Sequence, residues 1–505
     1  KSPKTGTIFE SNIGGSFGPE LKFAGYDGIV VTGKADKPVY LKIEDNVVTL
    51  EDAAPLVGKG IFETEAWLKN KIDFDIKTLS IGPAGENLIE FACVGSESYR
   101  QMGRGGAGAL FGAKNLKAIA VRGTGGVQVN EMGAFYEKVV EHTTENFLTN
   151  DNMWAYHHGT AMLVDVTNEM GIHPTRNFSK GVSNGRLSLN AEAIDDIKIG
   201  DRSCASCPMG CGKFTSLNGT QMEGPEYETL CLGGSNCEIH NLEAVMKFNR
   251  LCDDYGLDTM STGNIIGLAM DITESSLHDY GIRFGNAEEY LCLIEEIAMG
   301  STQRGKDLAL GAKKLAAKHG AEDMAAHAKN LEMPAYDPRG NYGMALGYAT
   351  SERGACHLRS FTLFEDEPFK VKEMTQAVMK NQNINAVKWS MGLCDFWGTV
   401  DTSIMADFMT KGLGKKISGR DLEKAGERIW NLTRLFNLKA GFTAADDTIS
   451  DRLLNKALEN GPYEGKKFDL KALAQMKALL YHLRGWDTEG RPLEKKLEEL
   501  DLLDA

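Results

Sequence analysis

The stretch LKAIAVRGTGGVQVNEMGAFYEKVVEHTTENF, residues 116–147, decides the fold class, because the spacing of its apolar residues changes halfway along it. Its first part, LKAIAVRG, is typical of a β-strand that ends at a glycine turn. From EMGAFYEKVVEHTTENF onward, apolar residues recur at helical spacing. The sequence therefore predicts a boundary near residue 128, with strands before it and helices after it.

The chain before this boundary is rich in runs of β-forming residues. Examples are GIVVTG and PVYLKIEDNVVTL, and Gly, Asp and Asn turns separate them. We expect residues 1–128 to form one β-rich domain.

The chain after the boundary is mainly helical by its spacing, as in NLEAVMKFNRLCDDYG and EEYLCLIEEIAMG. The stretch KNLEMPAYDPRGNYGMALG, residues 329–347, interrupts this pattern with prolines and glycines. We therefore expect an α+β multidomain protein, in which two mainly α-helical domains, residues 129–333 and 334–505, follow the β-rich domain.

Composition restricts the classes of partner. The 505 residues carry a formal net charge of −14 without a long basic block, which argues against nucleic acid as a ligand. No apolar run is long enough for a membrane-spanning helix. Cysteines that cluster once, instead of scattering in pairs, favour a reducing cytoplasm over a disulfide framework. Three others, Cys93, Cys252 and Cys292, lie in apolar runs and are expected to be buried.

The stretch CASCPMGC, residues 204–211, brings Cys204, Cys207 and Cys211 together with the spacing C-x2-C-x3-C. Such thiolates suit a structural zinc ion or a [4Fe-4S] cluster. Zinc ribbons usually present C-x2-C knuckles in pairs, and the chain has no second one, which favours iron and sulfide. Spacing alone leaves the fourth ligand open among four downstream cysteines: Cys231, Cys237, Cys356 and Cys394.

Eight motifs in order give the chain a resemblance to a known family. They are KSPKTG with GPELKFAGYDGIVVTGK, GRGGAGALFGAKNLKAIAV, CASCPMGC, GPEYETL, DDYGLDTMSTG, DPRGNYGMALGYATSERGACH, GLCDF and LRGWD. Over nearly its whole length the sequence resembles the tungsten-containing aldehyde:ferredoxin oxidoreductases. The resemblance implies a tungsten, or sometimes molybdenum, bis-pterin cofactor held by the β-rich base domain, close to a [4Fe-4S] cluster.

The family's two pterin-binding loops have the forms D-x-x-G-L-D and D-x-x-G-L-C. The first loop is intact in this sequence as Asp253, Gly256, Leu257 and Asp258. The second loop supplies Gly392, Leu393 and Cys394, and the resemblance makes Cys394 the fourth cluster ligand. Trp389 stands where this second loop usually has aspartate, so one pterin contact is expected to be lost or replaced.

The resemblance also places two glycine-rich stretches around the pterin phosphates, with a magnesium ion between them. Closely spaced backbone N–H groups and a cation suit phosphate binding. The residues concerned are Asn12, Gly14, Gly15, Arg104, Gly105 and Gly106.

Glu228 in PEYET and His357 in GACHLRS match family positions that line the substrate cavity. A buried Glu or a neutral His can relay the protons that aldehyde oxidation releases. Glu226 precedes Glu228 by two residues, and in an extended segment both would share a face, so Glu226 is a competing candidate.

The resemblance favours an enzyme that oxidises an aldehyde with water to a carboxylic acid and passes electrons through the cluster to ferredoxin. The same scaffold could serve in a carboxylic acid reductase or as the catalytic subunit of a benzoyl-CoA-type aromatic ring reductase, with an iron–sulfur partner subunit. A non-catalytic iron–sulfur or zinc-structured protein is the alternative of another class. Family members begin several dozen residues before KSPKTG, so we also expect an upstream segment that adds strands to the base domain.

Overall fold

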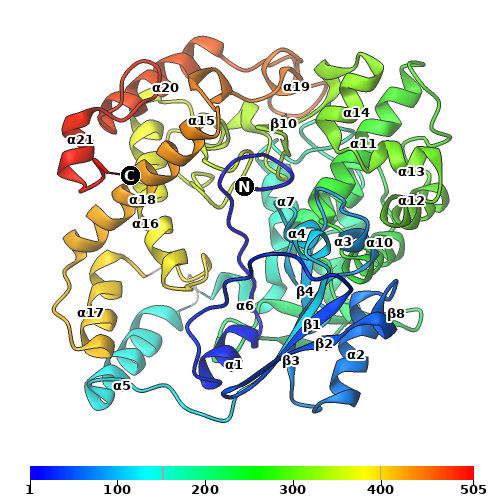
Figure 1. Ribbon diagram of the computed structural model, residues 1–505. Helices are drawn as coiled ribbons and strands as arrows, with labels where there is room; N and C mark the ends of the chain where they lie inside the picture. The colour runs from blue at the N-terminus through cyan, green and yellow to red at the C-terminus, as the bar shows by residue number, and fades with distance from the viewer. Residues whose placement is uncertain (150–152, 399, 505) are drawn as a thin grey trace.

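A six-stranded mixed sheet organises the N-terminal part of the computed structural model, which describes residues 1–149, 153–398 and 400–504 (Figure 1). The strand order is β2-β1-β6-β3-β4-β5. The strands are β1 (Val39–Glu44), β2 (Val47–Asp52), β3 (Lys77–Ser80), β4 (Val94–Ser96), β5 (Arg100–Met102) and β6 (Leu116–Arg122). Strand β6 runs parallel to β1 and antiparallel to β3, so the predicted strand LKAIAVR lies inside the sheet.

Strand β6 is buried on both faces, which explains its nearly continuous apolar sequence. Ile119 and Val121 pack in the layer that contains Phe17 of α1 (Phe17–Phe23). Ala118 and Ala120 pack in the layer that contains Leu68 of α2 (Ile61–Lys71). Strand residues alternate between faces, so the two helices cover opposite sides of the sheet.

The rest of the chain is mainly helical, as the sequence predicts. The remaining helices are α3 (Pro83–Glu86), α4 (Ala107–Ala113), α5 (Met132–Glu141), α6 (Trp154–His158), α7 (Leu163–Glu169), α8 (Ala191–Asp195), α9 (Tyr227–Thr229), α10 (Leu242–Tyr255), α11 (Thr259–Glu274), α12 (Ala287–Met299), α13 (Gln303–Leu308), α14 (Ala312–His319), α15 (Tyr342–Thr350), α16 (Val371–Ser390), α17 (Thr402–Leu413), α18 (Gly419–Lys439), α19 (Asp451–Leu454), α20 (Leu470–Leu483) and α21 (Glu494–Glu499). Figure 1 shows the helices of residues 242–319 on one side of the molecule and α16, α17, α18, α20 and α21 of the C-terminal part on the other.

Two smaller sheets interrupt the helical part. The first has the order β7-β8-β9 and consists of β7 (Lys198–Arg202), β8 (Gly212–Leu217) and β9 (Thr220–Glu223). The cysteine motif connects β7 to β8 and is therefore anchored at both ends. The second is a hairpin of β10 (His327–Ala328) and β11 (Leu331–Glu332).

Helix α11 lies at the centre of the largest core and is buried on nearly all sides. Small residues allow this close packing. A Cβ atom at Gly263 would lie 2.5 Å from the Leu232 carbonyl oxygen, and one at Gly267 would lie 3.0 Å from the Asn236 side chain. Helices around α11 thus approach its backbone directly.

The burial predicted for three cysteines is right for two of them. Cys93 and Cys252 are buried, whereas Cys292 is exposed on α12. The prediction for Cys292 was wrong because α12 buries only one face, formed by Tyr290, Leu293 and Ile297, and position 292 falls outside it. Of the helices in the described ranges, none has the length and apolar content needed to cross a membrane.

Residues 2–8 run through the interior and contact distant parts of the chain (Figure 1). The Ser2 hydroxyl donates to the Gly105 carbonyl oxygen at 2.7 Å. Lys4 Nζ lies 2.6 Å from Glu332 Oε1, and these side chains are 0% and 1% exposed. Burial raises the pKa of Glu332, but Lys4, the Ala312 N–H and Arg104 together outweigh this effect and hold the pKa below its usual value.

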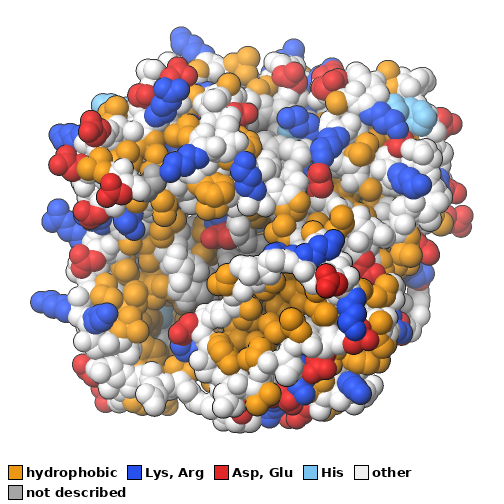
Figure 2. All heavy atoms as spheres, in the orientation of Figure 1, with side chains coloured by type: hydrophobic (Ala, Val, Ile, Leu, Met, Phe, Trp, Pro, Cys, Tyr) orange, Lys and Arg blue, Asp and Glu red, His pale blue; other side chains and the backbone are white. Residues whose placement is uncertain are grey.

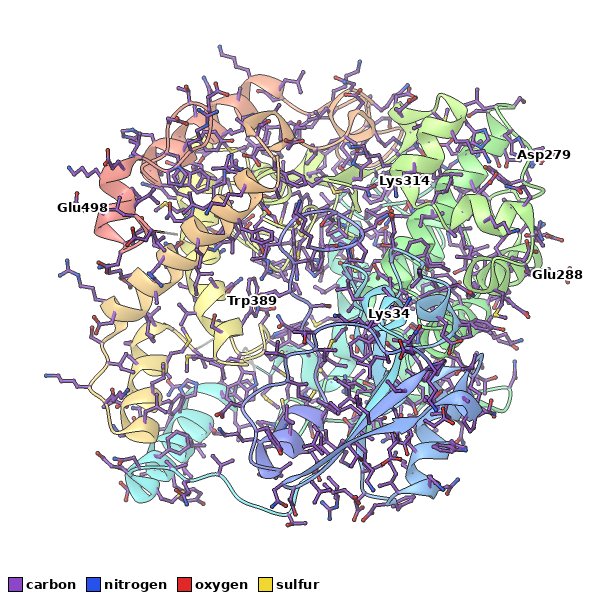
Figure 3. All side chains as sticks on the ribbon, viewed as in Figure 1. Lys34, Asp279, Glu288, Lys314, Trp389 and Glu498 are labelled. Atoms are coloured by element: carbon purple, nitrogen blue, oxygen red, sulfur yellow. The ribbon has the colours of Figure 1, made fainter. Side chains whose placement is uncertain are left out.

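Lys4→Met is expected to destabilise the protein by about 3–5 kcal/mol, because it leaves the Glu332 carboxylate buried without its partner. Since the pKa of Glu332 is depressed, the pair's contribution is present at neutral pH and is lost as the pH falls through that pKa. Urea denaturation at neutral pH measures the change. Lys34→Met, at an exposed lysine (Figure 3), is the matched control. A loss no larger than that of the control would contradict the prediction.

Candidate functional site

Glu228 and His357, which the sequence singles out in separate motifs, lie side by side. His357 Nδ1 is 3.4 Å from Glu228 Oε1, and both side chains are largely buried. Glu228 lies in the short helix α9, where its Oε2 accepts a hydrogen bond of 2.9 Å from the Ala335 backbone N–H. His357 follows α15 in a loop and packs against the ring of Tyr336.

Burial keeps both members of this pair neutral at pH 7. It raises the pKa of Glu228 to about 8, partly offset by the Ala335 N–H and Arg104. It lowers the pKa of His357 to about 3, and the positive charges of Arg104 and Arg353 act in the same direction. The site thus holds a neutral imidazole beside a carboxyl that titrates close to physiological pH, as acid–base catalysis requires.

The competing candidate Glu226 faces elsewhere. It precedes α9, and its carboxylate accepts a hydrogen bond from the Thr160 hydroxyl. Because α9 begins between the two glutamates, the segment is not extended and the two side chains do not share a face. The condition under which both glutamates would share a face, an extended segment, is therefore not met, and it is Glu228 that lies beside His357.

Arg104 connects three of the predicted motifs. Its Nε lies 3.4 Å from Asp258 Oδ2, and its terminal nitrogens donate to the carbonyl oxygens of Ala355 at 2.8 Å and Glu332 at 2.6 Å. The glycines after it are required by close packing. A Cβ atom at Gly105 would lie 2.4 Å from the Phe9 ring, and one at Gly106 would lie 2.3 Å from the Glu90 carbonyl oxygen.

The first predicted pterin loop joins α10 to α11. Gly256 ends α10 in the left-handed conformation, and Asp258 caps α11 by accepting from the Met260 N–H at 3.1 Å. Leu257 forms an isolated β-bridge with Ala92, next to strand β4, which holds the loop against the N-terminal part.

Asp253, the acidic residue that opens this loop, is fixed by protein contacts. Its oxygens accept hydrogen bonds from the side chains of Gln101 at 3.1 Å and Asn249 at 3.0 Å. Burial raises the pKa of Asp253 well above its usual value.

The second predicted loop follows α16. Gly392 has a φ of 71°, and the Leu393 N–H donates to the Lys388 carbonyl oxygen at 2.9 Å. Trp389 points from the end of α16 toward the middle of the molecule (Figure 3). Its indole N–H donates to Asp395 Oδ1 at 2.9 Å, and the Arg359 guanidinium lies 4.0 Å from its ring.

The structure brings Cys394 next to the cysteine motif. Cys207 and Cys211 pack in one apolar cluster with Phe396 and Trp397, which follow Cys394 directly. Burial raises the pKa of the Cys394 thiol, and the neighbouring Asp395, Cys207 and Cys204 add to this effect.

The other downstream cysteines lie in different surroundings. Cys231 and Cys237 are buried and donate to backbone carbonyl oxygens, of Pro174 for Cys231 and of Leu232 and Gly263 for Cys237. The Cys356 sulfur accepts a hydrogen bond of 2.7 Å from Arg353. Of the four cysteines that spacing left open, Cys394 is thus the one whose thiol borders the motif.

The stretch SNIGG lies against this motif. A Cβ atom at Gly14 would lie 2.6 Å from Cys204 Sγ, and the Ala205 N–H donates to the Gly15 carbonyl oxygen at 3.2 Å. Gly15 has a φ of 88°, in the region that favours glycine, and Asn12 is exposed. Within the described ranges, no three His, Cys, Asp or Glu side chains converge closely enough to hold a single metal ion.

Family models match almost the whole chain. The model described as aldehyde ferredoxin oxidoreductase, N-terminal domain, matches residues 1–123. The model described as aldehyde ferredoxin oxidoreductase, domains 2 and 3, matches residues 138–502. The chain belongs to the aldehyde ferredoxin oxidoreductase family.

Similar proteins support this assignment. The tungsten-containing aldehyde ferredoxin oxidoreductases of Pyrococcus furiosus and Thermococcus kodakarensis are each 40% identical over 527 residues, which cover 99% of this chain and 86% of each relative. The aliphatic sulfonate oxidoreductase WOR-like subunit of P. furiosus is 27% identical over 553 residues, covering 100% of this chain and 85% of the relative.

A solved structure shares the fold. The active site complex BamBC of benzoyl coenzyme A reductase, bound to 1,5-dienoyl-CoA, matches with a TM-score of 0.82 over 99% of this chain and 85% of that chain. At 23% identity this match shows the fold alone.

This aldehyde ferredoxin oxidoreductase family member also has site residues that the sequence motifs missed. Glu332 connects Lys4, Arg104 and Ser261, and Asp395 holds the indole of Trp389. Both acidic residues lie within or beside quoted motifs. Each is a carboxylate in a stretch that is otherwise poor in charge, and this pattern could have indicated them. Carboxylates are rarely buried unless they are paired, so a buried one points to specific partners.

Proposed function

We propose that this enzyme oxidises an aldehyde with water to a carboxylic acid at a tungsten bis-pterin centre and passes electrons through a [4Fe-4S] cluster to ferredoxin. The observation that carries the proposal is the buried pair of Glu228 and His357 beside Arg104 and the first pterin loop. The tungsten-containing relatives support the choice of metal. The four neighbouring cysteines support the cluster.

The residues present fit such a cofactor. Glu228 Oε1 and His357 Nδ1 face each other at 3.4 Å without forming a hydrogen bond in the described part of the chain, so neither atom is committed to another protein group. The glycines at positions 14 and 15 bring backbone close to Cys204 and Glu97, and those at positions 105 and 106 let the backbone after Arg104 pack against Phe9 and Glu90. Figure 2 shows a hollow near the middle of this face, between the N-terminal part and the C-terminal helices.

Specific residues would hold each part of the cofactor. The loops at residues 253–258 and 392–394 would bind one pterin each. Arg104 would hold the phosphates, because each of its terminal nitrogens keeps a second N–H. The glycine-rich backbone and Asn12 would hold the phosphates and their magnesium ion with it. The sulfur ligands of the cluster would be Cys204, Cys207, Cys211 and Cys394.

The protein residues would handle the protons of the reaction. When bound, the cofactor would supply the oxidising power that removes the aldehyde C–H hydrogen with its electron pair, as a hydride equivalent. Neutral His357 would donate an N–H to the carbonyl oxygen and polarise it, since burial and Arg104 prevent its protonation. Glu228 in its ionised form would accept a proton from the attacking water.

Aromatic side chains beside the pair favour substrates with an apolar substituent. The Tyr336 and Phe361 rings lie 5.1 Å and 6.1 Å from the His357 ring. Phe361 in turn lies 5.9 Å from Phe364, which is 65% exposed. This row leads from the surface to the site, and its apolar faces suit aliphatic or aromatic aldehydes.

Metal, iron and pterin analysis of the purified protein, followed by assays in both directions, tests the proposal. We expect tungsten with two pterins per chain, and ferredoxin reduction that depends on aldehyde. A pterin-free protein would show a non-catalytic role. Activity only toward carboxylic acids or aromatic acyl thioesters, with a reductant and partner subunits, would show the reductase alternatives and overturn the assigned reaction.

A further inference from the structure

We propose that Asp395 replaces the acidic residue missing from the second pterin loop and supplies the carboxylate that binds the second pterin. The inference rests on the bis-pterin function proposed above. It starts from a difference between the two loops of this chain: Asp253 opens the first, whereas Trp389 stands at the same position in the second.

The contacts of Trp389 show that its indole fixes a carboxylate. Its N–H donates to Asp395 Oδ1 at 2.9 Å. The Arg359 guanidinium lies 4.0 Å from the ring and is itself paired with Glu352 at 2.5 Å and Glu10 at 2.7 Å. The indole therefore cannot turn freely, and the orientation of Asp395 is set by it.

The second oxygen of Asp395 is available to a ligand. Oδ2 accepts no hydrogen bond from any residue in the described ranges, and this oxygen is not fully buried. Nearby Lys388 donates to the backbone carbonyl oxygens of Asp395 and Trp397 and not to this carboxylate. A half-buried carboxylate with one oxygen fixed and the other open is suited to accept hydrogen bonds.

The chemistry of a pterin matches this arrangement. Its amino-pyrimidinone ring presents neighbouring N–H groups, which a carboxylate can accept together. Asp395 follows Cys394 directly and lies three residues after Gly392, in the turn closed by the Trp397 N–H and the Cys394 carbonyl oxygen, so it adjoins the loop that the second pterin is proposed to contact. In the second loop the carboxylate thus stands at the position after the cysteine, whereas in the first loop it stands at the first position.

Pterin content distinguishes this inference from the function on which it rests. Asp395→Asn replaces one acceptor by a donor that faces the pterin N–H groups. We expect the purified variant to hold about half the pterin of the unmodified protein, with little tungsten and with unchanged iron, because one of two pterins loses its partner. Asp366→Asn, at an exposed aspartate, is the matched control and should keep full pterin content.

A second variant tests whether position 389 and position 395 share one role. Trp389→Asp in the Asp395→Asn background returns a carboxylate to the first position, and we expect pterin content to recover. Full pterin content in Asp395→Asn, or joint loss of pterin and iron, would overturn the inference and leave the oxidoreductase proposal standing. Unmodified protein without pterin would instead overturn the proposed function itself.

Discussion

Glu228→Gln is expected to lower kcat by about 10²- to 10⁴-fold while tungsten, pterin and iron contents stay unchanged. The amide keeps the volume of the side chain and can still accept the hydrogen bond from the Ala335 N–H. It cannot take a proton from water. Steady-state assays with an aldehyde and ferredoxin measure kcat, and metal and pterin analysis of the same samples measures the cofactor.

The pH dependence provides an independent check on Glu228. Since burial raises its pKa to about 8, the ionised form gains population as the pH rises toward that value. We expect kcat/KM of the unmodified enzyme to rise with pH and to level off above about pH 8, and we expect Glu228→Gln to lack this rise.

Matched variants make the result specific. Glu226→Gln changes a neighbouring carboxylate that bonds to Thr160, and it should keep near-native rates. His357→Asn should lose activity as Glu228→Gln does. Cofactor loss in either site variant would assign that residue a structural role, and near-native rates in both would place the proton transfer elsewhere.

Cys394→Ala is expected to remove or convert the [4Fe-4S] cluster, because a cubane held by thiolates would lose one ligand of its four. The structure supports this choice, since Cys394 lies near Cys204 and Cys207 although it is far from them in sequence. Iron analysis and electron paramagnetic resonance of the reduced protein measure the effect.

The control for this experiment is Cys231→Ala. Cys231 is buried and its thiol donates to the Pro174 carbonyl oxygen at 3.3 Å, away from the motif. Its loss should leave the iron content and the resonance signal unchanged. Equal iron loss in the two variants would contradict the ligand assignment.

Periodicity predicted the change from strands to helices because each strand and helix buries a face that matches its own period. Helix α10 follows this rule, whereas the inner strand β6 is buried on both faces and was recognised by its continuous apolar run. Helix α2 and the sheet β7-β8-β9 were not predicted. In α2 the buried positions include Thr64 and Glu65, so polar residues obscure the apolar stripe that would have identified the helix.

The candidate site was predictable residue by residue but not in its arrangement. Motifs identified Glu228, His357 and Arg104, whereas their contacts depend on how three distant segments fold together. The relative orientation of Glu226 and Glu228 also depends on the structure. The helical turn of α9 starts between them, so their side chains do not share a face. Trp389 was recognised as a departure, but only packing shows that Asp395 lies against its indole.

The threading of residues 2–8 through the interior has a consequence for the order of folding. These residues contact Gly105, Glu332 and Asn437, so their native contacts span very different separations along the chain. Contacts between distant segments must overcome the entropy of closing long loops, and a topology rich in them folds slowly. We therefore expect this segment to dock late, after the sheet and the helical core have formed around the place where the cofactor belongs.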